Sequence, residues 1–144
     1  MMLIVSCSGV QTVVDEPSKN FDSEEVLNLI FNSYKNFSSN PEQAVDTIWG
    51  FAHENNKEIT GPKERFSQML MSEPYDSIID LREYSYEVIY EDETNVHYEV
   101  KVLAKNNNYF IITWNFEKTD CPELKKQCWL TIAVTAPSYF DSGI

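Results

Sequence analysis

Apolar residues recur every three or four positions in three stretches of the first half of the chain, which predicts three helices. The predicted helices cover residues 23–37, 41–56 and 63–73. Asp22 and Glu25 have the spacing of a capping box at the start of the first helix. Asn40 followed by Pro41 is a typical start for the second helix, and the Asn55-Asn56 pair is its predicted end.

After Pro74 the pattern changes to alternation of apolar and polar residues, which is typical of strands. The predicted strands cover residues 83–91, 95–105, 109–117 and 127–135. The segments between them are short and contain turn residues, so we expect antiparallel hairpins. Helices followed by strands predict an α+β fold, with three N-terminal helices packed on a curved antiparallel sheet of four or more strands.

The alternation sorts the strand residues onto two faces of the sheet. The face expected to meet the helices carries Tyr84, Tyr86, Val88, Tyr90, Val96, Tyr98, Val100, Val102, Phe110, Ile112, Trp114, Phe116, Leu130, Ile132 and Val134. The opposite face is charged but also carries Ile89, Leu103, Ile111 and Trp129. Four large apolar residues on a charged face predict a homodimer contact, although scattered surface hydrophobes are the common alternative.

The composition is that of one globular domain. The chain has 144 residues, of which 42% are hydrophobic and 24% charged, which is enough for a self-sufficient core. The net charge of −12 disfavours nucleic-acid binding and polybasic docking to membranes. No apolar run is long enough to cross a bilayer, so we expect membrane contact only through a lipid anchor. The domain is expected to cover residues 23–136, followed by a C-terminal tail, 137–144.

The run Leu3-Ile4-Val5-Ser6-Cys7 resembles the end of a bacterial lipoprotein signal peptide, with an apolar stretch, a small residue and the cysteine that receives the lipid. It lacks the basic segment of such signals, and its apolar stretch is shorter than usual. The hypothesis is that residues 1–7 are a signal remnant with Cys7 as the lipidation site, and that residues 8–22 are a flexible tether. The protein would then be anchored in the bacterial cell envelope and face the periplasm. The alternative is a protein of the cytoplasm or of a plastid.

Cys121 and Cys128 bracket a polar segment between two predicted strands. A disulfide there would close the hairpin and stabilise it by about 2.5 kcal/mol. Together with a lipidated Cys7 it would explain all three cysteines by export to an oxidising compartment, whereas free thiols would favour the intracellular alternative. The spacing is not that of a zinc site, and we predict no metal and no cofactor.

Six runs of residues between positions 24 and 136 carry a family resemblance. They are Asn40-Pro41-Glu42, Trp49-Gly50-Phe51-Ala52-His53-Glu54-Asn55-Asn56-Lys57, Thr60-Gly61-Pro62, Arg65-Phe66, Met69-Leu70-Met71-Ser72-Glu73-Pro74-Tyr75 and Cys128-Trp129. In these runs the chain resembles an uncharacterised bacterial and plastid branch of the nuclear transport factor 2-like (cystatin-like) superfamily. The resemblance implies a cone of three helices against a curved antiparallel sheet. It implies no particular activity.

Enzymes of that superfamily place an acid, a base or a Tyr/His pair inside the cone. The inward strand positions here hold several tyrosines and one tryptophan but no Asp, Glu or His, so the first hypothesis is a non-catalytic domain that binds a small apolar ligand or a protein partner. The pocket candidates are Trp49, Tyr86, Tyr98 and Trp114, which also fit an ordinary core. One alternative is a small enzyme of isomerase or hydrolase type that uses Asp46 or Asp80, and another is an intracellular assembly or interaction module. His53, expected near the end of the second helix, and His97, expected on the outer face, fit structural roles.

Overall fold

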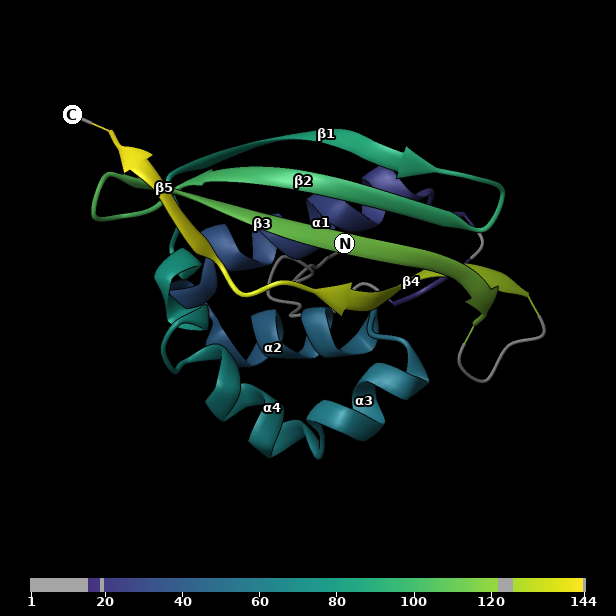
Figure 1. The fold of residues 1–144 in the computed structure, drawn as a ribbon. Helices are drawn as coiled ribbons and strands as arrows, with labels where there is room; N and C mark the ends of the chain where they lie inside the picture. Colours follow the sequence, from purple (N-terminus) through teal and green to yellow (C-terminus); the bar gives the residue numbers. More distant parts are fainter. Residues whose placement is uncertain (1–15, 19, 122–125, 144) are drawn as a thin grey trace, which may run out of the picture.

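The computed structural model describes residues 16–18, 20–121 and 126–143. Within this part of the chain there are four α-helices, two short 3₁₀ helices and five strands (Figure 1). The helices are α1 (Ser23–Lys35), η2 (Phe37–Ser39), α2 (Pro41–Gly50), α3 (Glu54–Thr60), α4 (Lys63–Leu70) and η3 (Tyr75–Ile78). The strands are β1 (Glu83–Glu91), β2 (Asn95–Leu103), β3 (Asn108–Asp120), β4 (Gln127–Val134) and β5 (Ser138–Ser142). The α+β class predicted from the sequence is confirmed.

The first two helices begin where their capping residues predict. The Asp22 carboxylate accepts a hydrogen bond from the Glu25 N–H, and the Glu25 carboxylate accepts one from the Asp22 N–H. At α2 the Asn40 side-chain oxygen accepts a hydrogen bond from the Gln43 N–H at 3.2 Å, with Pro41 at the first helical position. Local sequence therefore determines both helix starts.

The single helix predicted for residues 41–56 is two helices in the structure, because the chain between α2 and α3 pairs with β4. The Thr131 N–H donates to the Phe51 carbonyl at 2.7 Å, and the His53 N–H donates to the Thr131 carbonyl at 2.8 Å. Ala52 and Thr131 thereby form a parallel β-bridge. Backbone groups that bond to a strand cannot also continue a helix. This contact corrects the predicted helix end and the predicted number of helices.

The sheet is antiparallel throughout, and its strands follow the order β1-β2-β3-β4 without closing. Strand β3 has 13 residues, and two different strands pair along its second edge. β4 pairs with its C-terminal part from Trp114 onward, and β5 pairs with its N-terminal part up to Ile111. The predicted C-terminal tail thus contains a strand. The edge beside β3 is interrupted around Pro137, between β4 and β5.

Register shifts in two strands change which side chains face the helices. In β1 the shift pairs Tyr90 with His97, and their ring centroids lie 5.0 Å apart, so Tyr90 is half-exposed instead of facing the core as predicted. In β4 a shift leaves Ile132 unpaired, and Thr131, predicted for the outer face, is buried. One extra residue reverses the alternation beyond it, which a period-two pattern cannot detect.

The core lies between the sheet and the helices α1 and α2, and α3 and α4 lie beyond α2 (Figure 1). The side of α1 that faces the sheet is buried, and so is the central part of the sheet face that was expected to meet the helices. Buried residues of these two groups include Val26, Ile30, Tyr34, Val96, Tyr98, Val100, Val102, Ile112, Trp114, Phe116 and Leu130. Each fully buried apolar side chain stabilises the fold by roughly 1.5–3 kcal/mol.

A disulfide joins Cys121 and Cys128 at the hairpin between β3 and β4, where their Cα atoms lie 5.0 Å apart. Both side chains are buried. The structure thus contains the pairing predicted from the sequence. Cys7, the predicted lipidation site, lies outside the described residues.

Asp80 connects the region after η3 to the end of α1. Its backbone has a positive φ of 61°, and its N–H donates to the Tyr34 carbonyl at 2.8 Å. The carboxylate accepts hydrogen bonds from the hydroxyl and the N–H of Ser38, and Lys105 Nζ lies 3.8 Å away. Burial by itself would raise the pKa of Asp80, but the Ser38 hydrogen bonds and the Lys105 charge outweigh it and lower the pKa.

We predict that Asp80→Asn lowers the free energy of unfolding by about 1 kcal/mol at neutral pH, because a charge-assisted hydrogen-bond acceptor becomes neutral. Asparagine tolerates the left-handed backbone, so the loss reports on the charge. Since the folded pKa is lowered, the carboxylate stabilises the fold above its unfolded pKa of about 3.9, and this contribution is lost as pH falls through the folded pKa.

Urea unfolding at neutral pH and near pH 3 measures this difference. The gap between Asp80→Asn and the parent protein should shrink in acid. Asp76→Asn, on an exposed side chain nearby, is the control and should change stability little at either pH. A gap of equal size at both pH values would contradict the prediction.

Candidate functional site

A cavity of about 110 Å³ lies between the helices and the sheet, close to the interruption between β4 and β5. Its walls come from all four α-helices, from η3, and from β3 and β4. Side chains on these walls include Tyr34, Ile48, Asn56, Leu70, Trp114 and Val134. Pro137 lines it where the edge of the sheet is interrupted.

The cavity wall is apolar apart from a few hydroxyl and amide groups. None of the described residues that line it is an aspartate, glutamate, histidine, lysine, arginine or cysteine. The polar side chains are two tyrosines, two threonines and one asparagine: Tyr34, Tyr75, Thr60, Thr131 and Asn56. Such a wall favours an uncharged ligand, because a buried charge without a partner is costly.

Tyr34 is the most informative of these residues. It projects from α1, is 3% exposed, and packs against Phe31, Phe37 and Trp114 with ring centroids 5.8, 6.4 and 6.3 Å away. Its hydroxyl has no hydrogen-bond partner among the described residues, and its oxygen is not fully enclosed by protein atoms, as expected of a group that faces the cavity. Burial raises the pKa of Tyr34 well above its ordinary value, so the phenol stays protonated and can donate a hydrogen bond.

Trp114 and Thr131 form a hydrogen-bonded pair in the cavity wall. The Trp114 indole N–H donates to Thr131 Oγ1 at 2.8 Å, and both side chains are buried. Thr131 faces Trp114 because of the register shift at Ile132. The backbone of Thr131 also holds the chain between α2 and α3, so this one residue joins the cavity wall to the helices.

Of the four pocket candidates predicted from the sequence, Trp114 lines the cavity and the other three lie elsewhere. Tyr98 bonds to Ser23 Oγ at 2.8 Å through its hydroxyl. Trp49 packs against Phe66 with ring centroids 5.1 Å apart. Tyr34, on the buried side of α1, was not among the pocket candidates. A buried tyrosine needs a partner for its hydroxyl, and this is the signal that could have identified it.

Tyr86, the fourth candidate, belongs to a hydrogen-bonded group that fastens α1 to β1. Its hydroxyl donates to Glu24 Oε2 at 2.7 Å and accepts from the Asn28 side-chain amide at 3.1 Å. The Tyr84 hydroxyl donates to the other end of that amide, Asn28 Oδ1, at 2.5 Å. Because each hydroxyl is satisfied, this group holds two elements together and leaves no free donor for a ligand.

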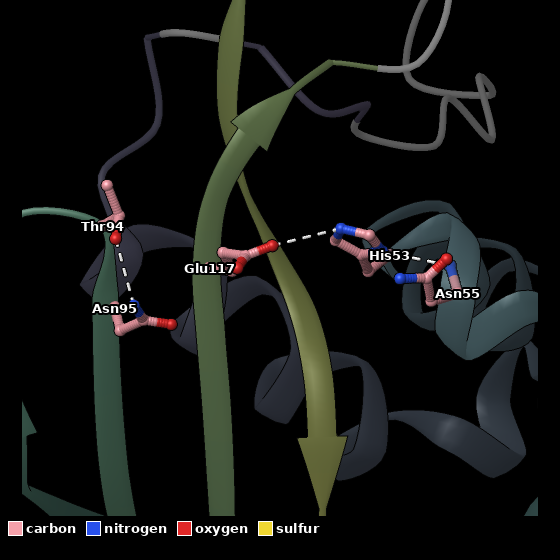
Figure 2. Close-up of polar contacts among 5 residues, drawn as sticks. All are labelled: His53, Asn55, Thr94, Asn95 and Glu117. Carbon is pink, nitrogen blue, oxygen red and sulfur yellow. Dashed lines mark hydrogen bonds and ion pairs between the residues drawn. The ribbon is translucent and has the colours of Figure 1, made fainter.

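His53 and Glu117 form the clearest polar contact near the cavity (Figure 2). His53 is the N-cap of α3 and not the end of a helix as predicted, and its Nδ1 accepts a hydrogen bond from the Asn55 N–H at 3.0 Å. Its Nε2 lies 3.2 Å from Glu117 Oε1 on β3. Both ring nitrogens are therefore engaged, which leaves neither free to act as a base.

The other two residues drawn in Figure 2 lie at the start of β2. The Asn95 side-chain amide donates to Thr94 Oγ1 at 3.0 Å, and Asn95 is the register partner of Glu117. Asp92 accepts hydrogen bonds from the N–H groups of both residues, at 2.9 and 2.8 Å. These contacts close the turn between β1 and β2.

The carboxylates considered for catalysis do not line the cavity. Asp46 is ion-paired with Lys63, and Asp80 is bound by Ser38 as described above. In the described part of the chain no group of three or more His, Cys, Asp or Glu side chains is placed to hold a metal ion. The charged side chains that were candidates for chemistry thus connect elements of the fold.

The four apolar residues predicted for a homodimer contact do not lie in one place. Leu103 on β2 and Ile111 on β3 occupy diagonal positions, since Leu103 pairs with Tyr109 and Ile111 pairs with Lys101. Ile89 lies at the register shift of the edge strand β1, and Trp129 lies on β4 beside Lys118. The homodimer stays a prediction.

Neither a scan against protein-family models nor a search of the curated proteins finds a match for this chain. Among the described residues, no helix has both the length and the apolar character needed to cross a membrane.

We predict that Tyr34→Phe leaves the free energy of unfolding unchanged or raises it by up to about 1 kcal/mol. Removing a hydroxyl that has no partner among the described residues breaks no hydrogen bond and removes the cost of keeping that group away from bulk water. Tyr98→Phe is the matched variant, because it removes a hydroxyl bonded to Ser23, and it should destabilise the protein by about 1 kcal/mol. Urea unfolding compares the two. An equal loss in both variants would show that the Tyr34 hydroxyl has a partner.

Proposed function

We propose that the protein binds a small, uncharged and mostly apolar molecule in the cavity, with the Tyr34 hydroxyl donating a hydrogen bond to an acceptor on that molecule. One observation carries the proposal. Tyr34 is a buried residue in the wall of an apolar cavity, and its hydroxyl has no hydrogen-bond partner among the described residues. A ligand oxygen would satisfy this donor, and the apolar wall would bind the rest of the ligand.

The cavity volume limits the ligand to a few heavy atoms. Sites for drug-sized molecules measure about 300–1,000 Å³, whereas an apolar cavity of about 150 Å³ in another protein binds benzene. At about 110 Å³ this cavity fits a single small ring or a short chain. A neutral ketone, aldehyde or ester supplies the acceptor oxygen without a charge that the wall cannot compensate.

Binding is favoured over catalysis by the chemistry of the wall. Proton abstraction or activation of water needs an acid or a base within hydrogen-bond reach of the substrate. The described residues of the wall offer hydroxyl, indole and amide groups instead. The protein is therefore proposed as a binding domain, since the described residues of the wall include no Asp, Glu or His for the small-enzyme alternative.

We also propose membership of the nuclear transport factor 2-like superfamily, with its cone-shaped fold. Support comes from helices packed on one face of an antiparallel sheet, with a cavity between the two layers. The fourth helix, α3, and the interrupted sheet edge are departures from the simple cone that the resemblance implies.

A matched pair of probes tests the binding proposal. Cyclopentanone and methylenecyclopentane have nearly the same shape, and only the ketone can accept a hydrogen bond. The chain has three tryptophans, so the indole N–H signal of Trp114 can be followed by NMR during titration. We predict that both probes shift this signal and that the ketone binds more tightly.

Tyr34→Phe should weaken ketone binding about fivefold to tenfold and leave hydrocarbon binding unchanged, since it removes only the hydrogen bond. Tyr139→Phe, on a tyrosine that is 61% exposed, should change neither affinity. Val134→Phe, which fills the cavity, should abolish both. The proposal fails if neither probe shifts the Trp114 signal, or if Val134→Phe binds as the parent protein does.

Export to the cell envelope is also proposed, and the disulfide between Cys121 and Cys128 supports it, because such bonds persist in oxidising compartments. The intact mass of the protein from its source cells, measured without reduction, tests this. We predict a chain that begins at Cys7, is heavier by a diacylglyceryl group and is lighter by two hydrogens. A chain without lipid and with free thiols would place the protein inside the cell.

A further inference from the structure

The helix α3 covers one side of the cavity while burying none of its own residues. Asn56 and Thr60 of α3 line the cavity, yet all seven residues of the helix are exposed or half-buried. The neighbouring helices differ, because α1 has six buried residues, α2 has four and α4 has two. A helix without buried apolar side chains gains little from packing and is held mainly by its ends.

The orientation of α3 also indicates that packing contributes little to holding this helix in place. Its one large apolar side chain, Ile59, points away from the protein and is 74% exposed. The side chains on the cavity side are the polar Asn56 and Thr60. The helix therefore lies over an apolar cavity with its polar side inward, so that hydrophobic burial does not hold it closed.

The first end of α3 is fixed by His53. The His53 backbone N–H bonds to the Thr131 carbonyl on β4, and its ring reaches Glu117 on β3 at 3.2 Å (Figure 2). The contact with Glu117 passes over β4, since Glu117 is the register partner of Leu130 on that strand. The ring thus fastens the helix start to the sheet, and the side chains of His53 and Glu117 are 16% and 38% exposed.

The second end of α3 is fixed at Gly61. The Gly61 N–H donates to the Lys57 carbonyl at 2.7 Å, and a Cβ atom at this position would lie 2.6 Å from that carbonyl oxygen and 3.0 Å from the Trp49 ring. Only glycine fits there. Lys57 Nζ in turn lies 5.5 Å from the centroid of the Trp49 ring, a cation–π contact between two half-buried residues.

From these observations we infer that α3 is the movable cover of the cavity. It opens by rotation about the backbone of His53 and of Gly61, and the contact between the His53 ring and Glu117 holds it closed. This inference rests on the proposed function for the entry of a ligand, although the opening itself is a property of the protein alone. A ligand reaches the Tyr34 hydroxyl when α3 lifts, and it is enclosed when His53 again meets Glu117. Covers of this kind come from the least stable parts of a fold.

Hydrogen exchange of the full-length protein tests the opening without any ligand. The amides of Lys57 and Gly61, which are bonded across α3, should exchange faster than the amides of α1. Glu117→Ala should speed exchange at these two amides about fivefold, because the contact that closes the cover is lost. Exchange in α1 should stay unchanged, which also shows that the variant is folded. Glu99→Ala, another strand glutamate, is the control and should leave α3 unchanged.

Ligand kinetics test whether the opening is the route into the cavity. With cyclopentanone as the probe, Glu117→Ala should raise the association and dissociation rates together, about fivefold, and keep the Kd within about twofold. NMR relaxation measurements at the Trp114 indole signal give both rates.

Unchanged exchange in α3 of Glu117→Ala overturns the inference, and so do unchanged ligand rates in a variant whose α3 exchanges faster. If α3 responds as expected but cyclopentanone does not shift the Trp114 signal even in the parent protein, the proposed function fails while the movable helix is upheld.

Discussion

The backbone of Thr131 is the constraint on which the rest of this structure depends. Its N–H and carbonyl bond to Phe51 and His53, and this pairing ends α2 and sets the start of α3. The register shift beside it turns its hydroxyl toward the Trp114 indole. A single residue on an edge strand therefore positions a helix boundary and part of the cavity wall. An edge strand can do this because one side of its backbone is free to pair with another segment.

Charged and uncharged polar groups have separate places in the molecule. The ion pairs and carboxylate hydrogen bonds lie outside the cavity and connect elements, as with Asp80 at Ser38 and Glu117 at His53. The groups that face the cavity are hydroxyls, an indole and an amide. Since a carboxylate is much harder to desolvate than a hydroxyl, this separation lets the cavity stay apolar within a chain of net charge −12.

Much of the fold could be predicted from local pattern. The capping box at Asp22, the start of α2 at Asn40-Pro41, and the strands separated by short turns all lie close to their predicted places. These features depend on interactions within a few residues of the chain, which the sequence displays directly. Trp114 was likewise predicted for the cavity because it lies on an inward strand position.

By itself, the sequence determined the class of the fold, most element boundaries, the pairing of Cys121 with Cys128 and the start of the helix that carries Tyr34. The tertiary structure decided where the second predicted helix divides and which face Thr131 occupies. It also decided that Tyr34 meets Trp114 at a cavity, with no partner for its hydroxyl in the described part of the chain. Each of these depends on a contact between residues far apart in the chain. Periodicity records only how neighbouring residues are spaced, so a strand pairing with a helix end, or an extra residue in a ladder, leaves no local signal.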